Sequence, residues 1–91
     1  MYVVVIKDAW DKEISRKAAV RKCVANDREL FLKFNKDDPW VAFDRTDSFI
    51  EKLDKFIESE GLKITKEEPI VRVNESGRYV VDVQYTIEKM N

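Results

Sequence analysis

The first apolar run of the chain covers Tyr2 to Ile6, and four of its five residues are β-branched. Apolar side chains at successive positions are typical of a strand buried on both faces, because alternate side chains of a strand point to opposite sides of its sheet. The pattern therefore predicts a strand at 2–6 that is central in its sheet.

The segment from Asp8 to Asp27 favours a helix through its alanines and long basic side chains, with Asp8 and Asp11 available as N-caps. Its apolar residues gather on one face centred on Ile14, although two basic side chains fall there too. The apolar members are Trp10, Ala18, Val24 and Ala25, and the basic ones are Lys17 and Arg21. An alternative is that only the first part is helical and that residues 20–25 form a strand. The composition favours the helix.

Two short segments with a turn between them predict a hairpin in the middle of the chain. Glu29 to Phe34 has the pattern of a strand, and Trp40 to Phe43 that of a return strand. Between them, 35–39 supplies Asn, Asp and Pro, which are common turn residues.

The most regular pattern lies between Thr46 and Gly61. Apolar residues recur there at the spacing of one helical stripe, namely at Phe49, Ile50, Leu53, Phe56 and Ile57. The start of the helix is marked by Thr46 and by Ser48 with Glu51 three residues later, which is the spacing of a capping box, and Gly61 marks its end.

Residues 70–89 predict a second hairpin with one apolar face. Alternation places five apolar residues of the last strand together, at Tyr79, Val81, Val83, Tyr85 and Ile87. A two-residue turn would put Val71 and Val73 on the opposite face. A three-residue loop over 75–77, with Gly77 in the left-handed conformation, brings all seven to one face and leaves the other face wet. We therefore predict that loop.

These elements predict a single α+β domain over residues 1–91. The order is strand, helix, strand, strand, helix and then a β-hairpin, and two helices cover one face of a mostly antiparallel sheet. This is a two-layer sandwich, and a ferredoxin-like variant is the nearest named architecture.

Charge changes the picture, because a net charge of −1 conceals two opposite halves. Residues 12–36 contain eight basic and three acidic residues, whereas residues 37–69 contain ten acidic and five basic ones. Such asymmetry can orient a charged partner, or it can be cancelled where two elements lie side by side.

The sequence lacks the residues that several kinds of metal, catalytic and phosphate-binding site require. The chain contains no His and one Cys, Cys23, so neither a Cys/His zinc site nor a His-assisted nucleophile can be assembled. With only Gly61 and Gly77, no glycine-rich phosphate loop can be built. We expect no cofactor, no metal and no catalytic residues, and Cys23 has the context of a small packing residue.

The charged segments and the tryptophans supply the candidate binding residues. The basic face comprises Arg16, Lys17, Arg21, Lys22 and Arg28, and the acidic face comprises Asp47, Glu51, Asp54 and Glu58. If the two helices lie side by side, these faces neutralise each other, and the protein then has no strong electrostatic field to attract a charged partner. Trp10 and Trp40 are candidate aromatic anchors, although a place in the core or at its edge is the commoner fate of such residues.

Elimination leaves a small non-enzymatic protein-binding module. Its character suits a stoichiometric inhibitor or regulator of the kind that phages or mobile elements encode. The alternative is an RNA- or DNA-binding domain that uses the basic segment 12–36. No run of apolar residues could span a membrane, and a cytoplasmic protein is expected, in the host cytoplasm if it is viral. A homodimer could form through a sheet edge, with the last strand as the candidate edge.

Overall fold

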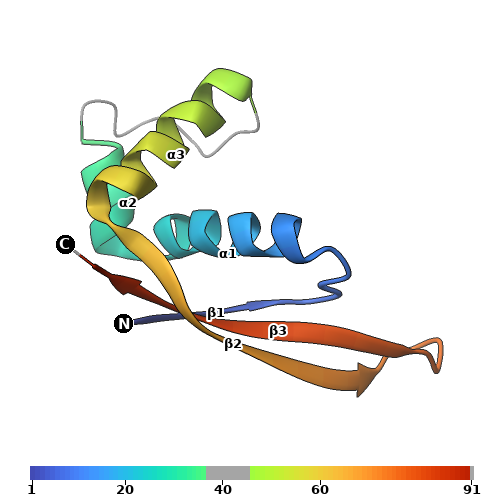
Figure 1. Ribbon diagram of the computed structural model, residues 1–91. Helices are drawn as coiled ribbons and strands as arrows, with labels where there is room; N and C mark the ends of the chain where they lie inside the picture. The colour runs from blue at the N-terminus through green and yellow to red at the C-terminus, as the bar shows by residue number, and fades with distance from the viewer. Residues whose placement is uncertain (37–45, 91) are drawn as a thin grey trace.

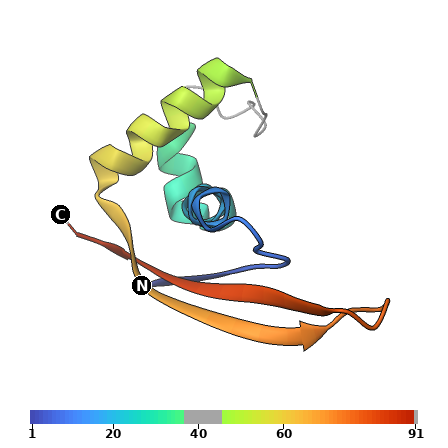
Figure 2. The same ribbon diagram turned by 45° about the vertical axis from the view of Figure 1, so that its right-hand side comes forward.

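The described part of the chain forms a small three-stranded antiparallel sheet with three helices on one side of it (Figure 1). The computed structural model describes residues 1–36 and 46–90. The elements are β1 (Tyr2–Ile6), α1 (Lys12–Asn26), α2 (Arg28–Phe34), α3 (Asp47–Glu60), β2 (Leu62–Val73) and β3 (Tyr79–Lys89). A view turned by 45° shows α1 nearly end-on between the sheet and α3 (Figure 2). The predicted mixed α+β class is confirmed.

The predicted strand at 29–34 is wrong, because these residues form α2. Asp27 caps this helix by accepting a hydrogen bond from the backbone N–H of Leu30 at 2.9 Å. Leu30 and Phe34 are both buried. They are four residues apart, and this spacing places two side chains on the same side of a helix and also on the same face of a strand. The predicted order, and with it the ferredoxin-like variant, fails at this element. The predicted return strand at 40–43 lies outside the described residues.

The helix predicted between Asp8 and Asp27 is confirmed as α1, so the alternative strand at 20–25 is wrong. Asp11 is its N-cap and accepts from the N–H of Ile14 at 3.0 Å. The predicted buried face is wrong, since Ile14 is 60% exposed. Of the predicted members Val24 is buried, and the other buried side chains of this helix are Ser15, Ala19 and Cys23. Small side chains on this stripe let the helix lie close to the sheet.

α3 has the predicted bounds, with Thr46 and Gly61 as its caps, whereas the predicted capping box at Ser48 and Glu51 is wrong because Ser48 lies inside the helix. Thr46 accepts from the N–H of Phe49 at 3.4 Å, and Gly61 ends the helix with a φ of 67°. The apolar stripe of α3 packs against α2, where the Phe34 ring meets the rings of Phe49 and Phe56 edge-on at 5.6 and 5.2 Å.

The strand order is β1-β3-β2, which makes β3 the central strand. The predictions of a central β1 and of a free edge at the last strand are therefore both wrong. β3 supplies the most deeply buried sheet residues, Tyr85 and Ile87, at 1% and 0% exposure. Thr65 is an extra residue in β2 between the paired Ile64 and Lys66, a bulge that shifts which side chains of β2 face the helices.

The predicted three-residue loop of the β2–β3 hairpin is confirmed. The backbone N–H of Asn74 donates to the carbonyl of Arg78 at 2.9 Å, and Gly77 has a φ of 79°. Val73 lies opposite Tyr79 and Val71 opposite Val81, so the apolar side chains share one face as the register argument required.

Candidate functional site

The outer half of the hairpin carries an exposed apolar surface, which we call the hairpin face. Its members are Trp10, Val71, Val73, Tyr79 and Val81. Trp10 and Tyr79 are 86% and 81% exposed, and the three valines are between 41% and 64% exposed. The four strand residues, Val71, Val73, Tyr79 and Val81, lie on the same side of the sheet as Tyr85 and Ile87, which are buried under α1. The hairpin face thus continues the core surface of the sheet beyond its helical cover.

Element lengths explain this exposure. α1 has 15 residues and spans about 22 Å, whereas β3 has 11 residues and spans about 37 Å. The hairpin therefore projects past the start of α1, as both ribbon views show (Figures 1 and 2). Trp10, in the connection between β1 and α1, stands beside Tyr79 and Val81 around a hollow of about 670 Å³. Asp8, Asn74 and Arg78 also line this hollow, so the surface at this end of the elongated molecule is concave and combines apolar with polar side chains.

Two of the three arginines of the basic face are held by acids of the same chain. Arg21 forms two hydrogen bonds with the Asp54 carboxylate, at 3.0 and 2.8 Å, and so links α1 to α3. Arg16 bonds Glu67 on β2, which Lys12 also approaches at 3.9 Å. These contacts hold the pKa of Asp54 and of Glu67 below their ordinary values, mainly through the arginine hydrogen bonds.

The other predicted charged residues are scattered. Lys17 pairs with Glu13 at 3.5 Å, and Glu51 pairs with Lys55 at 3.3 Å, each within its own helix. The remaining members are exposed, namely Lys22, Arg28, Asp47 and Glu58. The juxtaposition of α1 and α3 that would neutralise the two halves is present at Arg21 and Asp54, and no continuous basic face remains along α1.

Of the two predicted aromatic anchors, Trp10 lies in the open. Its 86% exposure, with apolar neighbours, removes it from the core that is the commoner place for tryptophan. Trp40 lies outside the described residues.

Two further charged clusters tie the elements together. Glu60 is buried at the end of α3. Its carboxylate oxygen Oε1 forms ion pairs with Nζ of Lys33 on α2 at 2.9 Å and with Nζ of Lys89 on β3 at 3.4 Å. The hydrogen bond from Lys33 is the main cause that lowers the pKa of Glu60. On the opposite side of the sheet, Asp82 accepts from Arg72 at 2.7 Å and from the N–H of Asp8 at 3.0 Å. These carboxylates are fully engaged in fixing the fold.

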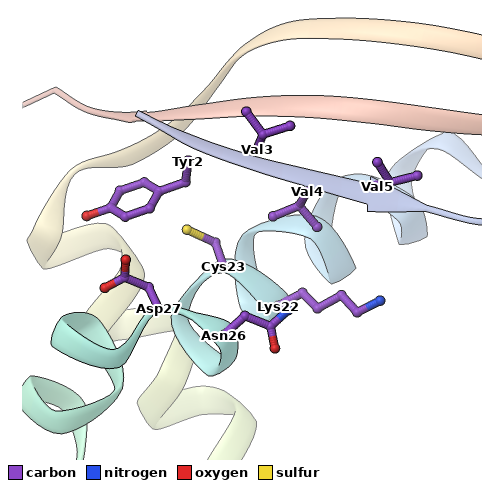
Figure 3. Close-up of a pocket in the computed structure, with 8 residues that line it drawn as sticks. All are labelled: Tyr2, Val3, Val4, Val5, Lys22, Cys23, Asn26 and Asp27. Atoms are coloured by element: carbon purple, nitrogen blue, oxygen red, sulfur yellow. The ribbon is translucent and has the colours of Figure 1, made fainter.

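A second concave surface runs along β1, between the strand and the end of α1 (Figure 3). Its volume is about 260 Å³, and Lys22, Cys23, Asn26 and Asp27 form its helical side. Cys23 is 3% exposed, and burial raises the pKa of its thiol to about 11. The thiol is therefore protonated at neutral pH and serves as a packing residue.

Residues 1–36 and 46–90 contain no group of three His, Cys, Asp or Glu side chains that could hold a metal ion. No helix within this part of the chain is long and apolar enough to cross a membrane. Comparison of the chain with protein-family models, with curated proteins and with solved structures gave no match.

Proposed function

We propose that this chain is a non-enzymatic protein-binding module that docks through the hairpin face. The observation that carries the proposal is the exposure of Trp10 and Tyr79 beside three exposed valines. An aromatic side chain has about 150–250 Å² to bury, so these two rings alone offer roughly 250–400 Å² to a partner. Monomers seldom expose apolar patches beyond a few hundred Å², and tryptophan and tyrosine are the residues most enriched at interface hot spots.

The charge distribution supports a protein partner over a nucleic acid. Arg16 and Arg21 are already bound to carboxylates of the chain, so a phosphate would have to compete with an ion pair at each of them. The net charge is −1, which gives no long-range attraction for a polyanion. A hollow lined by two aromatic rings together with Asp8, Asn74 and Arg78 fits a protein partner that offers both apolar and polar side chains.

A pull-down from native host lysate, with and without nuclease, tests the proposal with three proteins. They are the wild type, a hairpin-face variant (Trp10→Ser with Tyr79→Ser) and a matched surface control (Lys17→Ser with Lys55→Ser). The control removes two exposed side chains from ion pairs within single helices. We expect one discrete protein to be captured by the wild type and the control, to survive nuclease, and to be absent with the hairpin-face variant.

Two outcomes would overturn the proposal. Capture of the same protein by the hairpin-face variant would place the contact elsewhere. Recovery of nucleic acid alone, lost as the salt concentration rises, would establish the alternative of a nucleic-acid-binding domain.

A further inference from the structure

Among the described residues, 1–36 and 46–90, no strand pairs with the outer edge of β1, and backbone geometry identifies the groups on it. The carbonyl of Val81 accepts from the N–H of Ala9 at 2.8 Å, so Val81 directs its backbone polar groups toward β1. Alternate residues of β3, Val83 and Tyr85, do the same, and they bond Ile6 and Val4 directly opposite. The residues between, Val3 and Val5, therefore direct their N–H and C=O groups away from the sheet.

The two outer edges of the sheet differ in their protection. On β2 the same alternation directs Pro69 outward, where its missing N–H interrupts the row of donors. β2 also carries the bulge at Thr65, and both features hinder pairing with another strand. β1 has neither. Its outward-bonding residues, Val3 and Val5, are also 54% and 40% exposed on the side of the sheet without helices.

Charge along this edge favours a second copy of the chain as the occupant. Asp27 lies beside the Tyr2 end of β1, and the Lys22 side chain extends toward the Val5 end (Figure 3). The Asp27 carboxylate helps to raise the pKa of Tyr2, although burial is the larger cause, which agrees with this placement. A twofold axis at Val4 would pair two β1 strands antiparallel and bring Lys22 of each copy to Asp27 of the other.

We propose that two copies of the chain pair through β1 to form a continuous six-stranded antiparallel sheet. Val3 of one copy bonds Val5 of the other, and all four outward N–H and C=O groups of each strand are satisfied. The exposed valine side chains of both copies form one apolar strip on the helix-free side of the sheet. The hairpin face lies at the far end of each copy and takes no part in this contact.

Sedimentation equilibrium and amide hydrogen exchange over a range of concentrations test the dimer. We expect a monomer–dimer equilibrium, with protection of the Val3 and Val5 amides that rises with concentration. The Val71 and Val73 amides, which also point outward but on the β2 edge, are the internal control and stay fast. Val5→Pro removes one outward donor and abolishes the dimer, while circular dichroism verifies its fold.

Two further variants test the pairing of the β1 strands without removing a backbone N–H. Val3→Lys with Val5→Lys retains every N–H but places like charges across the twofold axis, and it also yields a monomer. Lys22→Gln removes two symmetric ion pairs and raises the dimer dissociation constant between about twofold and thirtyfold. A wild type that stays monomeric, or a dimer that persists in the Lys variant, overturns the proposal. Loss of the dimer only in the hairpin-face variant would likewise overturn it and place the second copy on the hairpin.

Discussion

Replacing Trp10 with alanine should leave the fold almost as stable as before, which is unusual for a tryptophan. With 86% of the residue exposed, only about one seventh of its surface is removed from water. For a side chain of about 150–250 Å², this is roughly 20–35 Å², worth about 0.5–0.9 kcal/mol at 25 cal/mol per Å². Leu53→Ala is the matched control, because Leu53 is 1% exposed and its truncation should cost about 2–5 kcal/mol.

Urea denaturation followed by far-ultraviolet circular dichroism measures both variants on one scale. The slope of the transition should not change for Trp10→Ala, since the same core unfolds. A loss of more than about 2 kcal/mol for Trp10→Ala would mean that the indole is packed in solution. The hairpin face would then be smaller than described, and the proposed docking surface would lose its anchor.

Three further outcomes follow from the same structure. Gly77→Ala should cost about 1 kcal/mol in urea denaturation, because φ is 79° there, whereas Gly77→Asn should cost less; equal costs would exclude backbone strain as the cause. The free energy of unfolding should stay constant near neutral pH and decrease as the pH drops below 4.5, the ordinary pKa of glutamate. The pKa values of Asp54 and Glu60 are lowered in the folded state, so the unfolded state binds protons first. A urea midpoint that stays constant through that range would contradict the ion-pair assignments. Arg21→Ala should lose up to about 1 kcal/mol at low salt and less at high salt; a loss unaffected by salt would point to packing of the side chain instead.

Local signals predicted the parts of the fold that depend on near neighbours in the chain. The stripe and caps of α3 and the three-residue hairpin loop are set by residues within a few positions of one another. α2 was missed because Leu30 and Phe34 satisfy a strand pattern as well as a helix pattern, and the Asp27 cap decided between them. The buried face of α1 was missed because a Ser, an Ala and a Cys are buried there while the more apolar Ile14 is exposed. Packing of the helix against Tyr85 and its neighbours on the sheet determines which of its side chains are buried.

The candidate site depends on how the helices and strands pack against one another, which the sequence does not show directly. The sequence grouped Val71, Val73, Tyr79 and Val81 on one apolar face, but it predicted that face to be buried. One signal was present, because an 11-residue strand is longer than a 15-residue helix can cover. The edge position of β1 had no such signal, since strand order is decided by how distant segments pair. The sequence left charge cancellation between α1 and α3 open as an alternative to a binding role. One such ion pair, Arg21 with Asp54, is present, whereas Lys17 pairs with Glu13 of its own helix.

Site-specific photo-crosslinking in the native host shows directly whether a partner protein docks on the hairpin face. A photoreactive amino acid would replace Val73 on the hairpin face and, as the matched control, Glu58 on the exposed side of α3. We expect a covalent adduct with one partner protein from position 73 and none from position 58. Adducts from position 58 alone, or no protein adduct from position 73, would contradict the assignment of the hairpin face as the docking surface.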